Sequence, residues 1–173
     1  VGVLTAASGS LSAQESSSER LLVLLRDASA LAIVDPASGT VLGRVSTGRD
    51  PHEVTATPDG RLAFVASPSD GISVIDIATQ REIRRVNTGP GSGVHDLLYV
   101  DGKVYFTIEG YKSIGRYDPE ADQIDWTLGI GQEGTHMLAL GRDGRTLFMP
   151  NRASNSVTMA EGAIDGPSET TLS

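Results

Sequence analysis

The sequence predicts an all-β protein: a β-propeller with three full four-stranded blades and part of a fourth. Asp59-Gly60, Asp101-Gly102 and Asp143-Gly144 recur every 42 residues, and a basic residue that opens a β-rich run follows each pair. Within each period four short runs rich in Val, Ile and Thr follow one another in the same order. Four strands in a period of about 42 residues are typical of a propeller blade. The 20 glycines among 173 residues are consistent with many tight turns.

The repeat predicts each strand in turn. RLLVLLR, from residue 20, fits one period before the first Asp-Gly pair, and Asp35, Asp76 and Asp118 each end a run. GISVIDI, from residue 71, has apolar residues on both faces, as expected between two blades. REIRRVNT, from residue 81, crowds charges onto one strand, which suits an outermost edge facing water. We therefore expect no helix of two or more turns within 20–159. The predicted strands are 20–26, 31–35, 41–46, 53–57, 62–67, 72–77, 82–87, 95–100, 103–108, 113–117, 123–128, 136–140, 145–149 and 155–159.

Three parts follow from this pattern. Residues 1–19 run from a small apolar stretch into Ser-rich residues, which indicates a signal-peptide remnant with cleavage after Ala13, or a flexible tail. Residues 20–160 form the partial propeller, and 161–173 are expected to be an irregular C-terminal tail. We expect neither terminal part to pack against the sheets. The signal-peptide interpretation favours a periplasmic or secreted location.

The number of periods bears on ring closure. A propeller ring usually contains 4–8 blades. Three full periods and part of a fourth supply fewer blades than such a ring needs. We therefore interpret the chain as a fragment of a longer closed ring, its N-terminal half. A short chain that dimerises to close the ring is the alternative.

The order of segments resembles the YVTN-type β-propeller repeat family, which includes lactonase-like propellers. The matching runs are PHEVTATPDG at 51–60, SVID at 73–76 and PNRASNSVT at 150–158, within a resemblance that extends from about Arg20 to Met159. This resemblance implies a ring of blades in which the histidine-bearing strand of each blade lies innermost, beside the central channel.

His52, His95 and His136 are the only histidines, and each opens the first run of its period. In a closed ring such positions form an arc around the axis, where neutral imidazoles could bind a divalent metal. The alternative is a packing or hydrogen-bonding role within the repeat. The spacing from histidine to turn glycine is eight, seven and eight residues. We therefore expect His52 and His136 to share one orientation, whereas the offset at His95 could turn it away.

Two further residues are candidates for a site at the channel. VYFTIEGYKSIGRYDP, from residue 104, resembles the blades of streptogramin-lyase-type propellers, which implies a metal-facing acidic residue at Glu109. A carboxylate is a suitable ligand for Mg²⁺. Asn151 occupies the corresponding place in the last period. The candidate ligand-binding residues are therefore His52, His95, His136, Glu109 and Asn151, and the candidate metal ligands are His52, His136 and Glu109.

The amino-acid composition excludes some classes of function. A net charge of −8 argues against a nucleic-acid partner, and the absence of cysteine excludes thiolate metal sites and a Cys nucleophile. We expect a non-catalytic binding or scaffold module that presents its blade loops to a protein, glycan or small molecule, with no membrane span in the mature chain. The alternative is a metal-assisted lyase or lactonase with its site at the central channel. The sequence assigns no catalytic residue and no cofactor beyond the candidate divalent metal.

Overall fold

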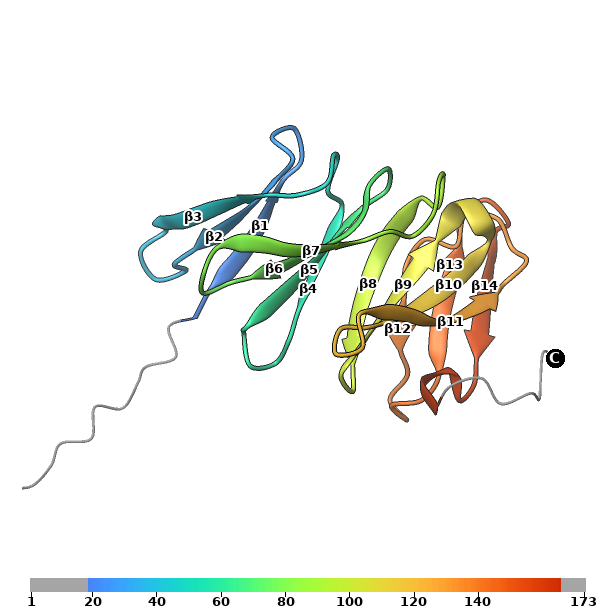
Figure 1. The fold of residues 1–173 in the computed structure, drawn as a ribbon. Coiled ribbons are helices and arrows are strands. Elements are labelled where there is room, and N and C mark those ends of the chain that lie inside the picture. The colour runs from blue at the N-terminus through green and yellow to red at the C-terminus, as the bar shows by residue number, and fades with distance from the viewer. Residues whose placement is uncertain (1–18, 166–173) are drawn as a thin grey trace, which may run out of the picture.

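The computed structural model describes residues 19–165, which form four antiparallel sheets placed one after another (Figure 1). Each sheet is a meander in which sequential strands pair, and we number the sheets blade 1 to blade 4 along the chain. The four blades are blade 1 with β1 (Leu21–Leu25), β2 (Ala30–Val34) and β3 (Val41–Ser46); blade 2 with β4 (Glu53–Ala56), β5 (Leu62–Ser67), β6 (Gly71–Asp76) and β7 (Arg81–Val86); blade 3 with β8 (Val94–Val100), β9 (Lys103–Ile108), β10 (Ser113–Asp118) and β11 (Gln123–Gly129); and blade 4 with β12 (Ala139–Leu140), β13 (Leu147–Asn151) and β14 (Ser156–Ala160).

The all-β prediction is confirmed, and a strand lies at each of the fourteen predicted places. The helices among residues 19–165 are two 3₁₀ helices of three residues each, η1 (Glu109–Tyr111) and η2 (Ala163–Asp165). The strands divide differently from the expected three full blades and a part, because two sheets have four strands and two have three. Blade 1 begins at the strand equivalent to β5, and blade 4 ends at the strand equivalent to β6. The described residues are therefore an arc of a propeller.

The packed part of the chain extends beyond the predicted boundary at residue 160. Ala163 in η2 is buried, and the Tyr105 hydroxyl of blade 3 donates a hydrogen bond to the carbonyl oxygen of Ile164 (3.1 Å). Residues 163–165, which were expected in an irregular tail, are therefore attached to blade 3. Residues 1–18 and 166–173, which were expected not to pack against the sheets, lie outside the described residues.

Strand β12 is the one strand much shorter than predicted, two residues in place of 136–140. The cause is Pro150 on its partner β13. The His136 N–H donates to the Pro150 carbonyl (3.0 Å), but proline has no N–H to return the bond. The pairing register also shifts by one residue between the Thr135–Asn151 bridge and the Ala139–Phe148 pair. The ladder is interrupted between these points.

The core lies between blades, not within them. Three apolar clusters fill the three interfaces: one contains Leu31 of blade 1 and Val65 of blade 2, the next Phe64 of blade 2 and Phe106 of blade 3, and the last Tyr105 of blade 3 with residues of blade 4. Alternate residues on a strand point to opposite faces, so each central strand contributes to two interfaces. This arrangement explains why the central strands have apolar residues on both faces.

Candidate functional site

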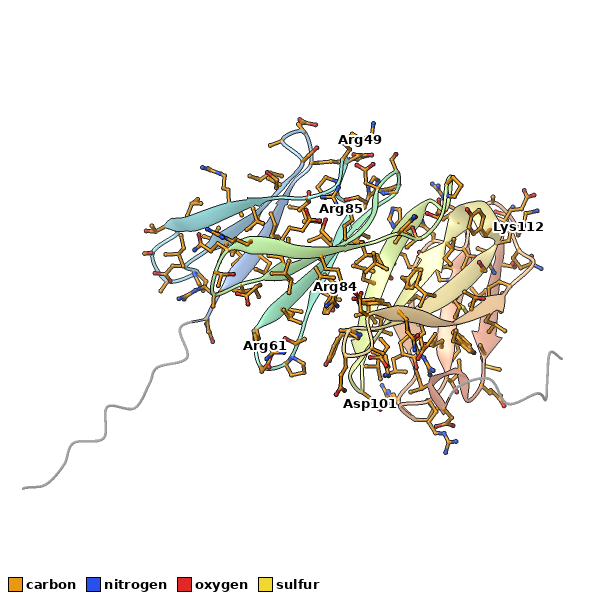
Figure 2. All side chains as sticks on the ribbon, in the orientation of Figure 1. Arg49, Arg61, Arg84, Arg85, Asp101 and Lys112 are labelled. Carbon is orange, nitrogen blue, oxygen red and sulfur yellow. The ribbon has the colours of Figure 1, made fainter. Side chains whose placement is uncertain are left out.

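The three histidines occupy equivalent places because their strands are equivalent when measured from the hairpin turn. The turns close with Thr57 bonded to Leu62, Val100 paired with Lys103, and Gly141 bonded to Thr146. Each histidine lies five residues before the first residue of its pair. The one-residue offset at His95 therefore arises from a shorter turn, and it does not turn His95 away from the other two rings. Arg61 and Asp101, in two of these turns, lie at the same end of their blades (Figure 2).

The three imidazole rings form a continuous row, which we call the histidine row (His52, His95 and His136). The centroids of the His52 and His95 rings are 4.7 Å apart in an edge-to-face arrangement, and those of His95 and His136 are 3.8 Å apart. The rings come from blades 2, 3 and 4, so successive blades converge at their first strands. His95 lies in the middle of the row.

A β-bulge places His95 in this position. The register of β8 against β9 shifts between Val94 and Leu97, so His95 and Asp96 lie in the irregular segment. The Asp96 N–H there donates to the hydroxyl of Thr107 (2.9 Å) in place of a backbone carbonyl. Bulges re-aim side chains at the rims of sheets, which is the effect here.

The two outer histidines have their Nδ1 atoms held by acceptors. The His52 Nδ1 lies 2.7 Å from the carbonyl oxygen of Asp50, which can only accept, so this nitrogen has the proton. The His136 Nδ1 lies 2.6 Å from Oε1 of Glu109 and donates to that carboxylate. In the neutral form of each ring, Nε2 therefore has the free lone pair. A carboxylate behind a histidine is typical of imidazoles that ligate metal.

Glu109 is held in place from both sides. It begins η1, where its N–H donates to Gly93 and the next N–H, of Gly110, donates to Ser92 (2.9 Å). A side chain at Gly110 would not fit, since a Cβ atom there would lie 1.9 Å from the Gly91 carbonyl oxygen. The second carboxylate oxygen of Glu109 accepts from Arg152 of blade 4 (3.2 Å). Glu109 therefore orients His136 from the neighbouring blade.

His95 differs from its neighbours because its Nδ1 is buried and has no hydrogen-bond partner. The pKa of His95 is lowered to about 4, mainly by burial and to a smaller extent by the neighbouring His136 and His52. At neutral pH the His95 ring, in the middle of the row, is therefore uncharged. It can lie in close contact with the His136 ring without electrostatic repulsion.

A buried carboxyl group, Asp96, and a half-buried one, Glu53, lie beside the row. Burial raises the pKa of Asp96, which accepts hydrogen bonds from Leu97 N–H (2.8 Å) and from Leu138 N–H of blade 4 (2.6 Å). Burial also raises the pKa of Glu53, with the charge of Asp96 as the second cause. Thr107 completes the network by donating to the His136 carbonyl (3.2 Å), the oxygen that Pro150 leaves without a partner.

The structure separates Asn151 from this group. Asn151 is 1% exposed, and its amide oxygen accepts from Thr135 while its nitrogen donates to Ser156 and Thr158. All of these partners belong to blade 4. Asn151 therefore stabilises its own blade, while His52, His95, His136 and Glu109 come together.

Within residues 19–165 no group of three His, Asp or Glu side chains is arranged to hold a metal ion. Glu109 is bonded to His136 and Arg152, and the His95 ring lies between His52 and His136. Two hollows on the described surface, one beside Arg20 and Leu42 and one beside Asp70 and Thr88, are not lined by any of the histidines. None of the described helices is long and apolar enough to cross a membrane.

Sequence reasoning missed Glu53, Asp96, Thr107 and Arg152. A signal for the first two was present, since His52-Glu53 and His95-Asp96 place a carboxyl group after the histidine in two successive periods. Thr107 and Arg152 have no such signal, because their roles depend on contacts between blades.

Fold and site together define a partial β-propeller with a histidine row along the first strands of three successive blades. The model of the cytochrome D1 heme domain family matches residues 17–113, more than half of the chain, and the chain belongs to that family. His52 and His95 lie within the matched residues, and His136 lies beyond them.

Among solved structures, a chain of hydrazine synthase from Kuenenia stuttgartiensis is similar in fold, with a TM-score of 0.73 at 24% identity. The match covers 84% of this chain but 43% of that one, so the described arc corresponds to less than half of its length. Among curated proteins none matches this sequence.

Proposed function

We propose that this chain is a binding module whose ligand contacts the histidine row. The observation behind the proposal is the state of the three rings: His52 and His136 each have Nδ1 bonded to an acceptor, and His95 is held neutral between them. Such imidazoles present lone pairs at Nε2, the form in which histidine binds metal centres. A row held only for packing would not need a carboxylate behind His136.

The ligand that we propose is a haem. The family name is one reason, and the donor set is the other, because haem iron takes as few as one axial imidazole from the protein. The absence of a three-residue metal group among the described residues is no obstacle to such a ligand. His136 is the residue that would hold the haem iron, since Glu109 fixes the orientation of its ring and keeps the proton on Nδ1. When bound, the haem would supply the redox or ligand-binding chemistry, and this chain would supply the imidazole and its orientation.

The alternative, a metal-assisted lyase or lactonase, needs a metal held largely by protein side chains. The cluster that His52, His136 and Glu109 would have to form is interrupted by the His95 ring. Glu53, whose pKa is raised by burial, is a nearby group suited to act as a general base in that alternative. The geometry favours the binding module.

Haem titration of the purified chain, followed by absorption and resonance Raman spectroscopy, tests the proposal. We expect a stoichiometric complex with the spectrum of an imidazole-ligated iron. His136→Ala should remove imidazole ligation, and Glu109→Gln should keep it but weaken the iron–imidazole bond. Glu133→Gln, an exposed change in the same loop region, should bind haem as the unaltered chain does. Equal haem spectra for the chain and His136→Ala would overturn the assignment.

Three further parts belong to this proposal. The first is that the blades are of the YVTN type, and the runs at 51–60, 73–76 and 150–158 support this.

The second is that the protein is periplasmic or secreted, and the leader-like residues that end near Ala13 support this. A protein or glycan partner would contact the blade loops, apart from the histidine row. Mass spectrometry of the protein recovered from a periplasmic fraction would test the cleavage after Ala13.

A further inference from the structure

We propose that the rings of the histidine row differ in tautomer: His52 and His136 have the proton on Nδ1, and His95 has it on Nε2. Pro68, directly after the second strand of blade 2, is the positioning residue that sets this difference. The tautomers do not depend on haem. Only the last step, which assigns the rings that can hold iron, rests on the proposed function.

A ring of the row has two sources of an acceptor for its Nδ1. The first is the carbonyl oxygen two residues earlier in the chain, and His52 uses it, with Asp50 at 2.7 Å. The second is the side chain that follows the second strand of the preceding blade, and His136 uses it, with Glu109 at 2.6 Å. Either acceptor keeps the proton on Nδ1, because it can pair only with an N–H.

His95 has neither acceptor. Two residues earlier lies Gly93, whose carbonyl oxygen accepts from the Glu109 N–H (3.4 Å) and not from the ring. Strands β5 and β9 both have six residues, and Pro68 follows β5 as Glu109 follows β9. Pro68 therefore has the place of Glu109, but a proline side chain offers no acceptor. In agreement with this, the Nδ1 of His95 is buried and has no hydrogen-bond partner among the described residues.

The surroundings of the His95 ring favour a proton on Nε2. A proton on Nδ1 would be a buried donor without an acceptor, which is rarer in proteins than a buried acceptor without a donor. Nε2 is not among the buried atoms that lack a partner, so an N–H there can reach water or a ligand. The rings of His52 and His136, with centroids 4.7 and 3.8 Å away, both have a lone pair at Nε2, which attracts an N–H in the ring between them.

The tautomers divide the work of the row. A protonated ring nitrogen has no lone pair for a metal, so His95 does not hold iron through Nε2. His52 and His136 keep that capacity, because their protons are fixed on Nδ1. Of the three Nε2 atoms, that of His95 is the hydrogen-bond donor.

Long-range ¹H–¹⁵N correlation spectra of the haem-free chain at neutral pH test the tautomers. For His95 we expect the chemical shift of a protonated nitrogen at Nε2 and of an unprotonated one at Nδ1, and the reverse for His52 and His136. Single His→Gln variants assign the signals. A His95 ring with its proton on Nδ1 overturns the proposal.

Two substitutions test the part of Pro68. Pro68→Glu gives blade 2 the acceptor that blade 3 has, so the two ¹⁵N shifts of His95 should exchange. Ser69→Glu, the matched control, adds the same charge at the exposed next residue of the turn and should leave them unchanged. The reciprocal change, Glu109→Leu, should move the proton of His136 to Nε2, and it tests the same rule without altering blade 2. A folded Pro68→Glu chain that keeps the His95 proton on Nε2 overturns the assignment of Pro68.

Haem titration of His95→Gln separates this inference from the proposed function. We expect His95→Gln to keep the spectrum of imidazole-ligated iron that His136→Ala loses. If the unaltered chain binds no haem, the proposed function fails, but the spectra of the haem-free chain still decide the tautomers. If haem binds and His95→Gln removes imidazole ligation, the exclusion of His95 as the iron ligand is overturned.

Discussion

The interface between blades 2 and 3 and the interface between blades 3 and 4 are built differently at their first strands. Between blades 2 and 3, β4 pairs with β5 without a register shift, β8 pairs with β9 on both sides of its bulge, and the apolar residues around Phe64 and Phe106 fill the interface. Between blades 3 and 4 the strand β12 has two residues, and Asp96 and Thr107 of blade 3 bond to the backbone of Leu138 and His136, in the segment that precedes it. Where a blade's own ladder is interrupted, the neighbouring blade supplies the hydrogen bonds.

The largest effect should come from the apolar interface. Phe106 is fully buried, and its ring occupies the space opposite Gly115, where a Cβ atom would lie 2.4 Å from the ring. Phe106→Ala should lower the free energy of unfolding by about 3–5 kcal/mol, because it removes buried surface and leaves a cavity. Urea denaturation measures this. Ile83→Ala, on an exposed site, should change it little, and a comparable loss in both variants would show that the interface has no special weight.

The next effect should come from Asp96, at the interface of blades 3 and 4. Asp96→Ala leaves the N–H groups of Leu97 and Leu138 without their acceptor in a buried place. We expect a loss of about 1–3 kcal/mol in the free energy of unfolding. Hydrogen exchange should show faster exchange at Leu138 than in the unaltered chain, with exchange at the β5 and β6 amides unchanged. Uniform acceleration over all four blades would contradict a local role for this carboxyl group.

The two interfaces also show which features of the structure could be predicted from the sequence and which could not. The period of 42 residues predicted fourteen strands and the common position of His52, His95 and His136, because turns and alternating apolar residues are local signals. The shortening of β12 could have been predicted from Pro150, which a central strand does not accommodate. The pairing of Glu109 with His136 could not, because it depends on how neighbouring blades are oriented. The burial of Asn151 depends instead on contacts between the strands of its own blade. Glu109 and Asn151 therefore looked equivalent in the sequence and differ in the structure.

The histidine row crosses both interfaces, so its pH dependence sharpens the comparison. The pKa of His95 is lowered from 6.5 to about 4 in the folded chain, which means that the unfolded chain takes up the proton first. The stability due to the neutral ring is present above pH 6.5 and is lost as the pH falls toward 4. The charged or titratable groups that affect this ring are His136, His52, Glu109 and Arg152.

We therefore expect His95→Gln to lose less stability than the unaltered chain between pH 6.5 and pH 4, measured by urea denaturation at each pH. The imidazole signals in NMR should show His95 titrating near pH 4, below the ordinary histidine value of 6.5. A His95 ring that titrates near 6.5 would contradict the burial of this position and the neutral state of the row.

The smallest effect should come from a polar contact that only supplements an apolar interface. Arg84 of blade 2, labelled in Figure 2, donates to the hydroxyl oxygen of Tyr117 in blade 3 (2.8 Å), and that hydroxyl donates to Asp122 (3.0 Å). Arg84 also donates to the carbonyl of Pro119 and pairs with Asp122, so it keeps partners when the hydroxyl is removed. The Tyr117 ring stays in the apolar cluster in either case.

Tyr117→Phe should therefore cost about 0.5–1.5 kcal/mol, the net value of one hydrogen bond, and less than Asp96→Ala. The difference follows from what is left behind: two buried backbone N–H groups without an acceptor at Asp96, but an arginine with other partners at Tyr117. Urea denaturation of the two variants and of the double variant tests this, and the two losses should add, because the sites belong to different interfaces. A Tyr117→Phe loss larger than that of Asp96→Ala would mean that the polar contact, not the apolar cluster, holds blades 2 and 3 together.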